Sequence, residues 1–141
     1  MESLHHLHIS HASIIAIVVS AVIQWLLGAV WYSPALFVKP WMAALGIRPD
    51  GEKKGFALAM VCSLIASLIL SFVLWHMVTW AQVTTWGAGA FIGFLCWLGF
   101  VAAPQFPQGL YERRPLVLFF INTGFWLVCM VVTGAILAIW R

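Results

Sequence analysis

Histidine is the residue type of this sequence best suited to metal chemistry, and four of its five histidines lie near the start of the chain. If that stretch is helical, His8 and His11 lie near one face, and imidazole nitrogens bind Zn and Cu well. Together with His76, they form one hypothesis, a Zn or Cu site. We favour the alternative, a polar cap that gains charge near neutral pH, because no carboxylate or cysteine nearby completes a tight site.

Two amide side chains stand inside apolar runs. Gln24 and Asn122 lie in the first and the last of these runs, and polar groups at membrane depth are functional candidates by default. The favoured interpretation is a hydrogen bond between Gln24 and Asn122, worth about 0.6 kcal/mol in membranes. The alternative is a polar path for a solute, lined by Gln24, His76 and Asn122.

The remaining side chains give little support for a catalytic site. The sequence contains no HExxH, GxSxG or P-loop pattern, and these patterns carry common metal-assisted and nucleophilic chemistries. Its four acidic residues lie outside the apolar runs, so we expect no acid–base pair within them. Arg113 and Arg114 beside Tyr111 form a small basic cluster of the kind that binds anionic lipid head groups. We therefore predict no enzyme activity, and no cofactor apart from the histidine hypothesis.

The composition indicates which elements must position these residues. Hydrophobic residues make up 64% of the 141 residues and charged residues 8%, against roughly 45–50% and about 25% in soluble domains. So few charges cannot cover a surface in water, which excludes soluble enzymes and nucleic-acid-binding modules. Spans of about 20 apolar residues cross a bilayer as helices, and four such spans are expected at residues 9–31, 56–80, 87–103 and 116–140. The predicted fold class is an all-α integral membrane protein, one domain over residues 1–141 with four transmembrane helices in one bundle.

Lysine and arginine residues set the expected orientation. The positively charged residues of the first and third loops are Lys39, Arg48, Lys53, Lys54, Arg113 and Arg114, while the opposite side has only Arg141. Positively charged short loops stay in the cytoplasm. Both termini are therefore expected on the non-cytoplasmic side, periplasmic or extracellular, of a bacterial inner (plasma) membrane.

Small residues recur at four-residue intervals in the apolar runs, and this spacing lets helices approach closely in lipid. The expected packing positions are Gly28 in the first run, Ser63 and Ser67 in the second, and Gly89 and Gly93 in the third. Packing within one bundle is the favoured interpretation. The alternative is that one face, above all that of Gly89 and Gly93, joins copies into a homo-oligomer.

Two loops contain prolines that shape the chain. Residues 31–34 end the first helix, because proline disfavours helical geometry in the residue before it. The apolar segment 37–42 that follows is expected to lie flat in the inner membrane interface. Segment 104–109 contains two prolines and a glycine. We expect it to form a rigid interfacial turn, with a re-entrant element as the alternative.

Part of this sequence resembles a known family. The run Gly28-Ala29-Val30-Trp31-Tyr32-Ser33-Pro34-Ala35-Leu36-Phe37, followed by Lys39 and Trp41, resembles the signature of the domain of unknown function 1761 family. Trp97-Leu98-Gly99-Phe100, followed by Leu110-Tyr111 and Arg114-Pro115, resembles the second half of that family. The similarity spans most of the chain from Ala21 onward. It implies a small bacterial membrane protein with about four helices and no assigned activity, so it transfers no catalytic residue. It also draws attention to the end of the first helix.

These observations together predict a non-enzymatic structural or accessory membrane protein. We expect it to contact membrane lipid and to self-associate or join a partner membrane subunit, and we expect no nucleic acid as a partner. The alternative function is a small transporter or channel whose solute path passes Gln24, His76 and Asn122.

Overall fold

The computed structural model describes residues 10–48, 50–51 and 54–140. These residues form α1 (His11–Trp31), α2 (Val38–Leu45), α3 (Phe56–Trp80), α4 (Trp86–Trp97), the π-helical turn η2 (Leu98–Ala102), α5 (Ala103–Tyr111) and α6 (Leu116–Ile139). Four helical stretches, 11–31, 56–80, 86–111 and 116–139, are long and apolar enough to cross a membrane. The prediction of an all-helical chain with four such helices is confirmed.

Local sequence explains where several helices begin. Ser10 caps α1, since its hydroxyl accepts the backbone N–H of Ser13 at 3.1 Å, and Thr85 caps α4 in the same way. Gly55 precedes α3 with φ of +82°, a left-handed conformation that glycine adopts without steric cost. Pro115 precedes α6, where the missing N–H of proline takes no bond away from the helix.

The third membrane-length stretch is longer than the sequence predicts. The predicted end at residue 103 and the predicted turn at 104–109 are wrong, because α4, η2 and α5 form one 26-residue stretch, Trp86–Tyr111. Within η2 the chain widens, so that the N–H of Ala103 bonds to Leu98 O. Pro104 follows directly at the start of α5, with Pro107 inside that helix. A π-helical turn before a proline gives its ring room, so the helix continues through Pro104.

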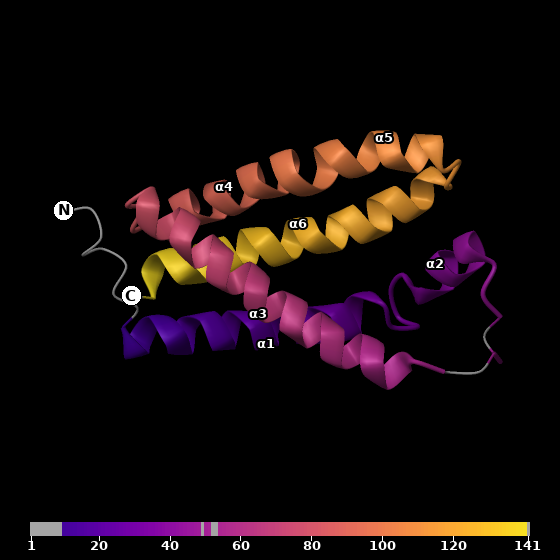
Figure 1. Ribbon diagram of the computed structural model, residues 1–141, viewed down its shortest axis with the longest axis horizontal. Coiled ribbons are helices and arrows are strands. Elements are labelled where there is room, and N and C mark those ends of the chain that lie inside the picture. The colour runs from indigo at the N-terminus through magenta and orange to yellow at the C-terminus, as the bar shows by residue number, and fades with distance from the viewer. Residues whose placement is uncertain (1–9, 49, 52–53, 141) are drawn as a thin grey trace.

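Helix α6 lies in the middle of the fold and touches α1, α2, α3, α4 and α5. Figure 1 shows α4 and α5 along one side of α6 and α1 along the other, while α3 crosses the bundle diagonally. The helix α2 and the turn between α5 and α6 lie at the same end of the bundle (Figure 1), which we call the α2 end. The start of α1 and the end of α6 lie at the opposite end.

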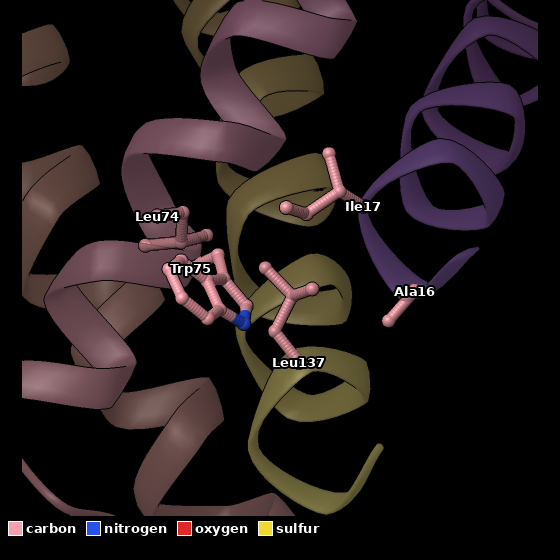
Figure 2. Packing of buried hydrophobic residues seen from close by; sticks show 5 residues of the cluster. All are labelled: Ala16, Ile17, Leu74, Trp75 and Leu137. Atoms are coloured by element: carbon pink, nitrogen blue, oxygen red, sulfur yellow. The ribbon is translucent and has the colours of Figure 1, made fainter. Parts of the chain in front are cut away.

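The main apolar core lies in the half of the bundle away from the α2 end. Its buried residues come from α1, α3 and α6, and they are Ala16, Ile17, Leu74, Trp75 and Leu137. Figure 2 shows the Trp75 ring beside Leu137, with Ile17 and Leu74 around them. Many other large apolar side chains face outward; Leu58, for example, is 69% exposed. An outer surface of this kind suits lipid rather than water.

Candidate functional site

Asn122 of α6 joins three parts of the chain at the α2 end. Tyr32, which caps the end of α1, donates its phenolic O–H to Asn122 Oδ1 at 2.9 Å. Trp41 of α2 donates its indole N–H to the same oxygen at 3.2 Å. Because an indole N–H can only donate, this bond fixes which amide atom is the oxygen. The amide nitrogen of Asn122, with its two hydrogens, has no hydrogen-bond partner within the described part of the chain.

The backbone carbonyls on either side of Asn122 accept two more indoles. Trp31 Nε1 donates to Ile121 O at 3.0 Å, and Trp97 Nε1 of α4 donates to Thr123 O at 2.7 Å. An indole N–H left unpaired in an apolar environment is costly. These bonds therefore hold α1 and α4 against one short segment of α6. We call Trp31, Tyr32, Trp41 and Trp97, together with residues 121–123, the aromatic clamp.

Ring contacts add to the aromatic clamp. The ring centroids of Trp31 and Phe37 lie 4.7 Å apart, and Tyr32 packs edge-on against Trp41 at 5.5 Å. Phe125 of α6 packs edge-on against Tyr32 at 5.7 Å. Aromatic pairs at such distances are worth about 0.5–1.5 kcal/mol beyond their buried area. The first two residues of the 31–34 motif therefore act as anchors between helices.

Ser33 and Pro34 form the turn that connects α1 to α2. The backbone oxygen of Ser33 accepts the N–H of Leu36 at 3.1 Å, which closes the turn around Pro34. The apolar segment 37–42 then enters α2, and Trp41 ties that helix to α6. The expected place of this segment in the membrane interface stays a prediction.

Burial changes the acidity of the Tyr32 phenol. It raises the pKa of Tyr32 from 10.0 to about 12, because the charged phenolate loses solvation there. The neutral phenol therefore persists throughout the physiological pH range and keeps the hydrogen that it donates to Asn122.

A cleft of about 310 Å³ opens between α5 and α6 at the α2 end, and Asn122 is one of its lining residues. The other polar residues in its wall are Gln105, Gln108, Glu112 and Arg114, and its apolar residues include Phe106, Leu118 and Phe119. Glu112 accepts a hydrogen bond from Gln108 Nε2 at 3.0 Å and forms an ion pair with Arg114. The cleft therefore places charged, amide and aromatic groups side by side.

The two arginines of the predicted head-group cluster lie in different places. Arg114 lines the α5–α6 cleft and pairs with Glu112. Arg113 is not among the residues that line this cleft, and its φ of +53° turns the chain after α5. Only one of the two is therefore positioned to contact a molecule inside the cleft.

Gln24 is fully buried and does not pair with Asn122. Its Nε2 donates to Ser71 Oγ of α3 and to Thr133 Oγ1 of α6, both at 2.8 Å. Thr133 and Asn122 stand eleven residues apart on α6, about 16 Å at roughly 1.5 Å per residue. The predicted Gln24–Asn122 hydrogen bond is therefore wrong. The two side chains lie at different levels because α1 ends beside Ile121, whereas α6 begins further out, at Leu116.

The three residues of the predicted solute path lie in separate places. Asn122 lines the α5–α6 cleft, Gln24 is enclosed by α1, α3 and α6, and His76 bonds within its own helix. Within the described residues they share no cavity that the structure shows. Two buried oxygens near the middle of α1, Ser20 Oγ and Gln24 Oε1, have no hydrogen-bond partner in that part of the chain.

The histidines do not form a metal centre within residues 10–48, 50–51 and 54–140. His76 Nδ1 lies 2.9 Å from Phe72 O, and aromatic rings of α3 surround the imidazole. His11 is exposed at the start of α1, while His8 lies outside the described residues. No three His, Cys, Asp or Glu side chains of the described residues come together as a metal ion would require.

Gly89 and Gly93 pack against α6 of the same chain. A Cβ atom at Gly93 would lie 2.1 Å from Met130 O, and one at Gly89 would lie 2.2 Å from Gly134 O. Both distances are far below van der Waals contact, so α4 and α6 touch backbone to backbone. The hypothesis that this face joins two copies is wrong, because α6 already occupies it.

The other predicted packing positions differ in whether they contact another helix or face outward. A Cβ atom at Gly28 would meet the Phe125 ring of α6 at 3.3 Å, so Gly28 also lies at a helix contact. Ser67 is buried, whereas Ser63 is exposed and donates to Met60 O of its own helix at 2.8 Å. The small-residue stripe of α3 therefore divides into an inward part and an outward part.

The partners of the buried polar side chains are not evident from the sequence. Ser71 and Thr133 hold Gln24, although hydroxyl residues in apolar helices give no sign of which amide they bond. In the sequence, only the family resemblance draws attention to Trp97. The abundance of tryptophan was the available signal, since each indole N–H needs an acceptor and helix carbonyls are the acceptors that an apolar chain offers.

Comparisons with known proteins add one finding. No curated protein and no solved structure matches this chain. A family model described as protein of unknown function (DUF1761) matches residues 15–138, a range that includes the whole aromatic clamp and the α5–α6 cleft. Because this match covers most of the 141 residues, the chain belongs to the DUF1761 family.

Proposed function

We propose that this chain is a non-enzymatic accessory protein of the bacterial inner membrane that works as a dimer. The proposed contact between the two copies is the outward face of α3. The proposed orientation places the α2 end in the cytoplasm, since Lys39 belongs to α2 and Arg48 and Lys54 belong to the segment between α2 and α3. The polar interior supports a role without catalysis, because the Gln24 side chain is bonded to other helices rather than lining a cavity.

The outward part of the α3 stripe carries this proposal. It consists of Ala59, Cys62, Ser63 and Ala66, which are all exposed, and we call it the α3 face. Small residues at this spacing let a second helix approach closely in lipid. Helix α3 is also poorly covered within the chain, since 17% of its most apolar part is buried, the same share as in the 86–111 stretch, against 39% for α6.

A second copy fits the chemistry of the α3 face. A two-fold axis along the membrane normal would place this face against the same face of another copy. The face has no charged residue that would repel a copy, and the Ser63 hydroxyl is already bonded to Met60 O. Contact between two such faces therefore leaves no new polar group unpaired.

The native cysteine on this face provides the test. In a symmetric dimer Cys62 lies opposite Cys62 of the other copy, within the Cα separation of about 4.4–6.8 Å that a disulfide needs. Oxidation of membranes that contain the full chain with copper phenanthroline should give a dimer on a non-reducing gel. The dimer should disappear on reduction and in Cys62→Ala.

A matched control separates a specific contact from random collision. Val61 is also exposed and lies at nearly the same depth, but it points about 100° away around the helix. In the Cys62→Ala background, Val61→Cys should cross-link at least about fivefold less than native Cys62, because its Cα lies outside disulfide range. Equal cross-linking at both positions, or none at Cys62, would overturn the proposal.

A further inference from the structure

We propose that the α5–α6 cleft binds the head group of a membrane phospholipid that carries both a phosphate and an ammonium group. Its charged residues stand where the membrane-length helices 86–111 and 116–139 end, which is the level of lipid head groups. The aromatic clamp lies beside it, and tryptophan and tyrosine favour that level. The cleft is thus placed to meet lipid head groups.

The charges of the cleft match a zwitterion better than a simple anion. Arg114 supplies a guanidinium that can bind a phosphate through two hydrogen bonds. Glu112 next to it supplies a carboxylate, which attracts an ammonium group and repels a bare phosphate. A head group with both charges can extend this ion pair into a four-charge network, whereas an anionic head group meets one attraction and one repulsion.

Asn122 adds neutral donors at a fixed place in the wall. Its oxygen is held by Tyr32 and Trp41, so its amide hydrogens are oriented before any ligand arrives and have no partner among the described residues. Phosphate and ester oxygens of a phospholipid accept such hydrogens. Gln105 in the opposite helix provides a second amide.

Size and apolar surface agree with a bound lipid. A volume of about 310 Å³ is at the small end of the roughly 300–1,000 Å³ typical of ligand pockets, which suits a head group whose acyl chains remain in the bilayer. Phe106 and Phe119 line the same cleft, and their rings lie 5.3 Å apart edge to face. They offer an apolar surface where the acyl chains begin.

Native mass spectrometry of the delipidated full chain tests this proposal. Phosphatidylethanolamine, phosphatidylglycerol with the same acyl chains, and inorganic phosphate are added separately to the protein in detergent. We expect a one-to-one adduct with phosphatidylethanolamine and at least about fivefold less with phosphatidylglycerol, because phosphatidylglycerol lacks the ammonium group that Glu112 would attract. Inorganic phosphate should give no adduct and should not compete.

Two adjacent arginines provide a matched pair of variants. Arg114→Gln should lower the fraction with bound phosphatidylethanolamine at least about tenfold, as expected for losing a charge-assisted hydrogen bond. Arg113→Gln removes the same charge one residue away, outside the cleft, and should change binding less than about twofold. Glu112→Gln should abolish the preference for phosphatidylethanolamine over phosphatidylglycerol.

Three outcomes would overturn the proposal. Equal loss in Arg113→Gln and Arg114→Gln would show a diffuse surface charge effect rather than a site. Equal binding of phosphatidylethanolamine and phosphatidylglycerol would show that the cleft has no preference for a zwitterionic head group. Competition by inorganic phosphate would show that the cleft binds free anions instead. If Arg114→Gln unfolds the protein, Arg114→Lys takes its place. Lysine keeps the positive charge but loses the paired hydrogen bonds of the guanidinium to a phosphate, so it should lower binding more than Arg113→Lys does.

Discussion

Tyr32 and Asn122 are 90 residues apart in the sequence, yet the Tyr32 phenol donates to Asn122 Oδ1 at 2.9 Å. The same oxygen accepts Trp41 of α2, so one amide oxygen fixes the end of α1 and the position of α2 against α6. Asn122 also lines the α5–α6 cleft. The aromatic clamp therefore connects the family motif at 31–34 with the proposed lipid site.

Tyr32→Phe should destabilise the protein by about 1 kcal/mol, because it removes one hydrogen bond and keeps the ring contacts. Asn122→Leu should cost more, about 1–3 kcal/mol, since it leaves the Tyr32 and Trp41 donors unpaired. Thermal unfolding in detergent, followed by near-UV circular dichroism, measures both. Tyr111→Phe is the control, because Tyr111 is 89% exposed and should show no change. Equal stability of Asn122→Leu and the native chain would argue against the clamp.

Tyr32 should ionise near pH 12, rather than near the usual value of about 10, because burial raises its pKa to about 12. Since the folded state favours the neutral phenol, its contribution to stability is fully present below about pH 10. That contribution is lost as the pH rises from about 10 through 12. Tyrosinate absorbance in the Tyr111→Phe variant follows Tyr32 alone, and an inflection near 10 would show that the phenol is solvated.

Gly93→Ala should destabilise the bundle by more than about 2 kcal/mol, because its Cβ atom would lie 2.1 Å from Met130 O and push α4 from α6. Gly99→Ala is the control, since nothing lies within 4 Å of a Cβ atom there. Its effect should be neutral or slightly stabilising, because alanine favours helix. The measurement is the unfolding temperature of each of the two variants, compared with that of the native chain. A Gly93→Ala protein of native stability would mean that α4 and α6 do not touch there.

Gln24→Leu should cost no more than about 1 kcal/mol. It removes two hydrogen bonds of about 0.6 kcal/mol each, while it also removes the buried oxygen Gln24 Oε1 that has no partner among the described residues. Gln24→Glu keeps the shape but places a carboxylate at membrane depth, and should cost about 3 kcal/mol near neutral pH. Comparable unfolding temperatures for the two variants would mean that water reaches this position.

Hydrophobic spans of about 20 residues were enough to predict the four membrane-length helices, since bilayer thickness fixes helix length. The end of the third helix was not predictable from Pro104 and Pro107 alone. Proline normally breaks a helix because it clashes with the preceding turn, but the π-helical turn η2 makes room for Pro104. Such a turn has no clear signal in one sequence.

The polar contacts were less predictable than the helices. Gln24 and Asn122 stand out in the sequence as polar residues in apolar runs, but their partners depend on how far α6 extends beyond α1. A shift of a few residues between helices changes which side chains meet, and hydropathy is insensitive to such a shift. Packing at Gly89 and Gly93 followed from size alone, although the neighbour on that face became known only from the position of α6.

Native mass spectrometry of the protein released from its own membrane in mild detergent tests the proposed dimer most directly. We predict two copies of the chain with no foreign subunit, and mostly single chains for Ala66→Leu, which enlarges the α3 face. Val61→Leu is the control, since Val61 is exposed on α3 but points about 100° away from Cys62 around the helix. A single chain in the native spectrum, or a dimer that Ala66→Leu leaves unchanged, would contradict association through α3.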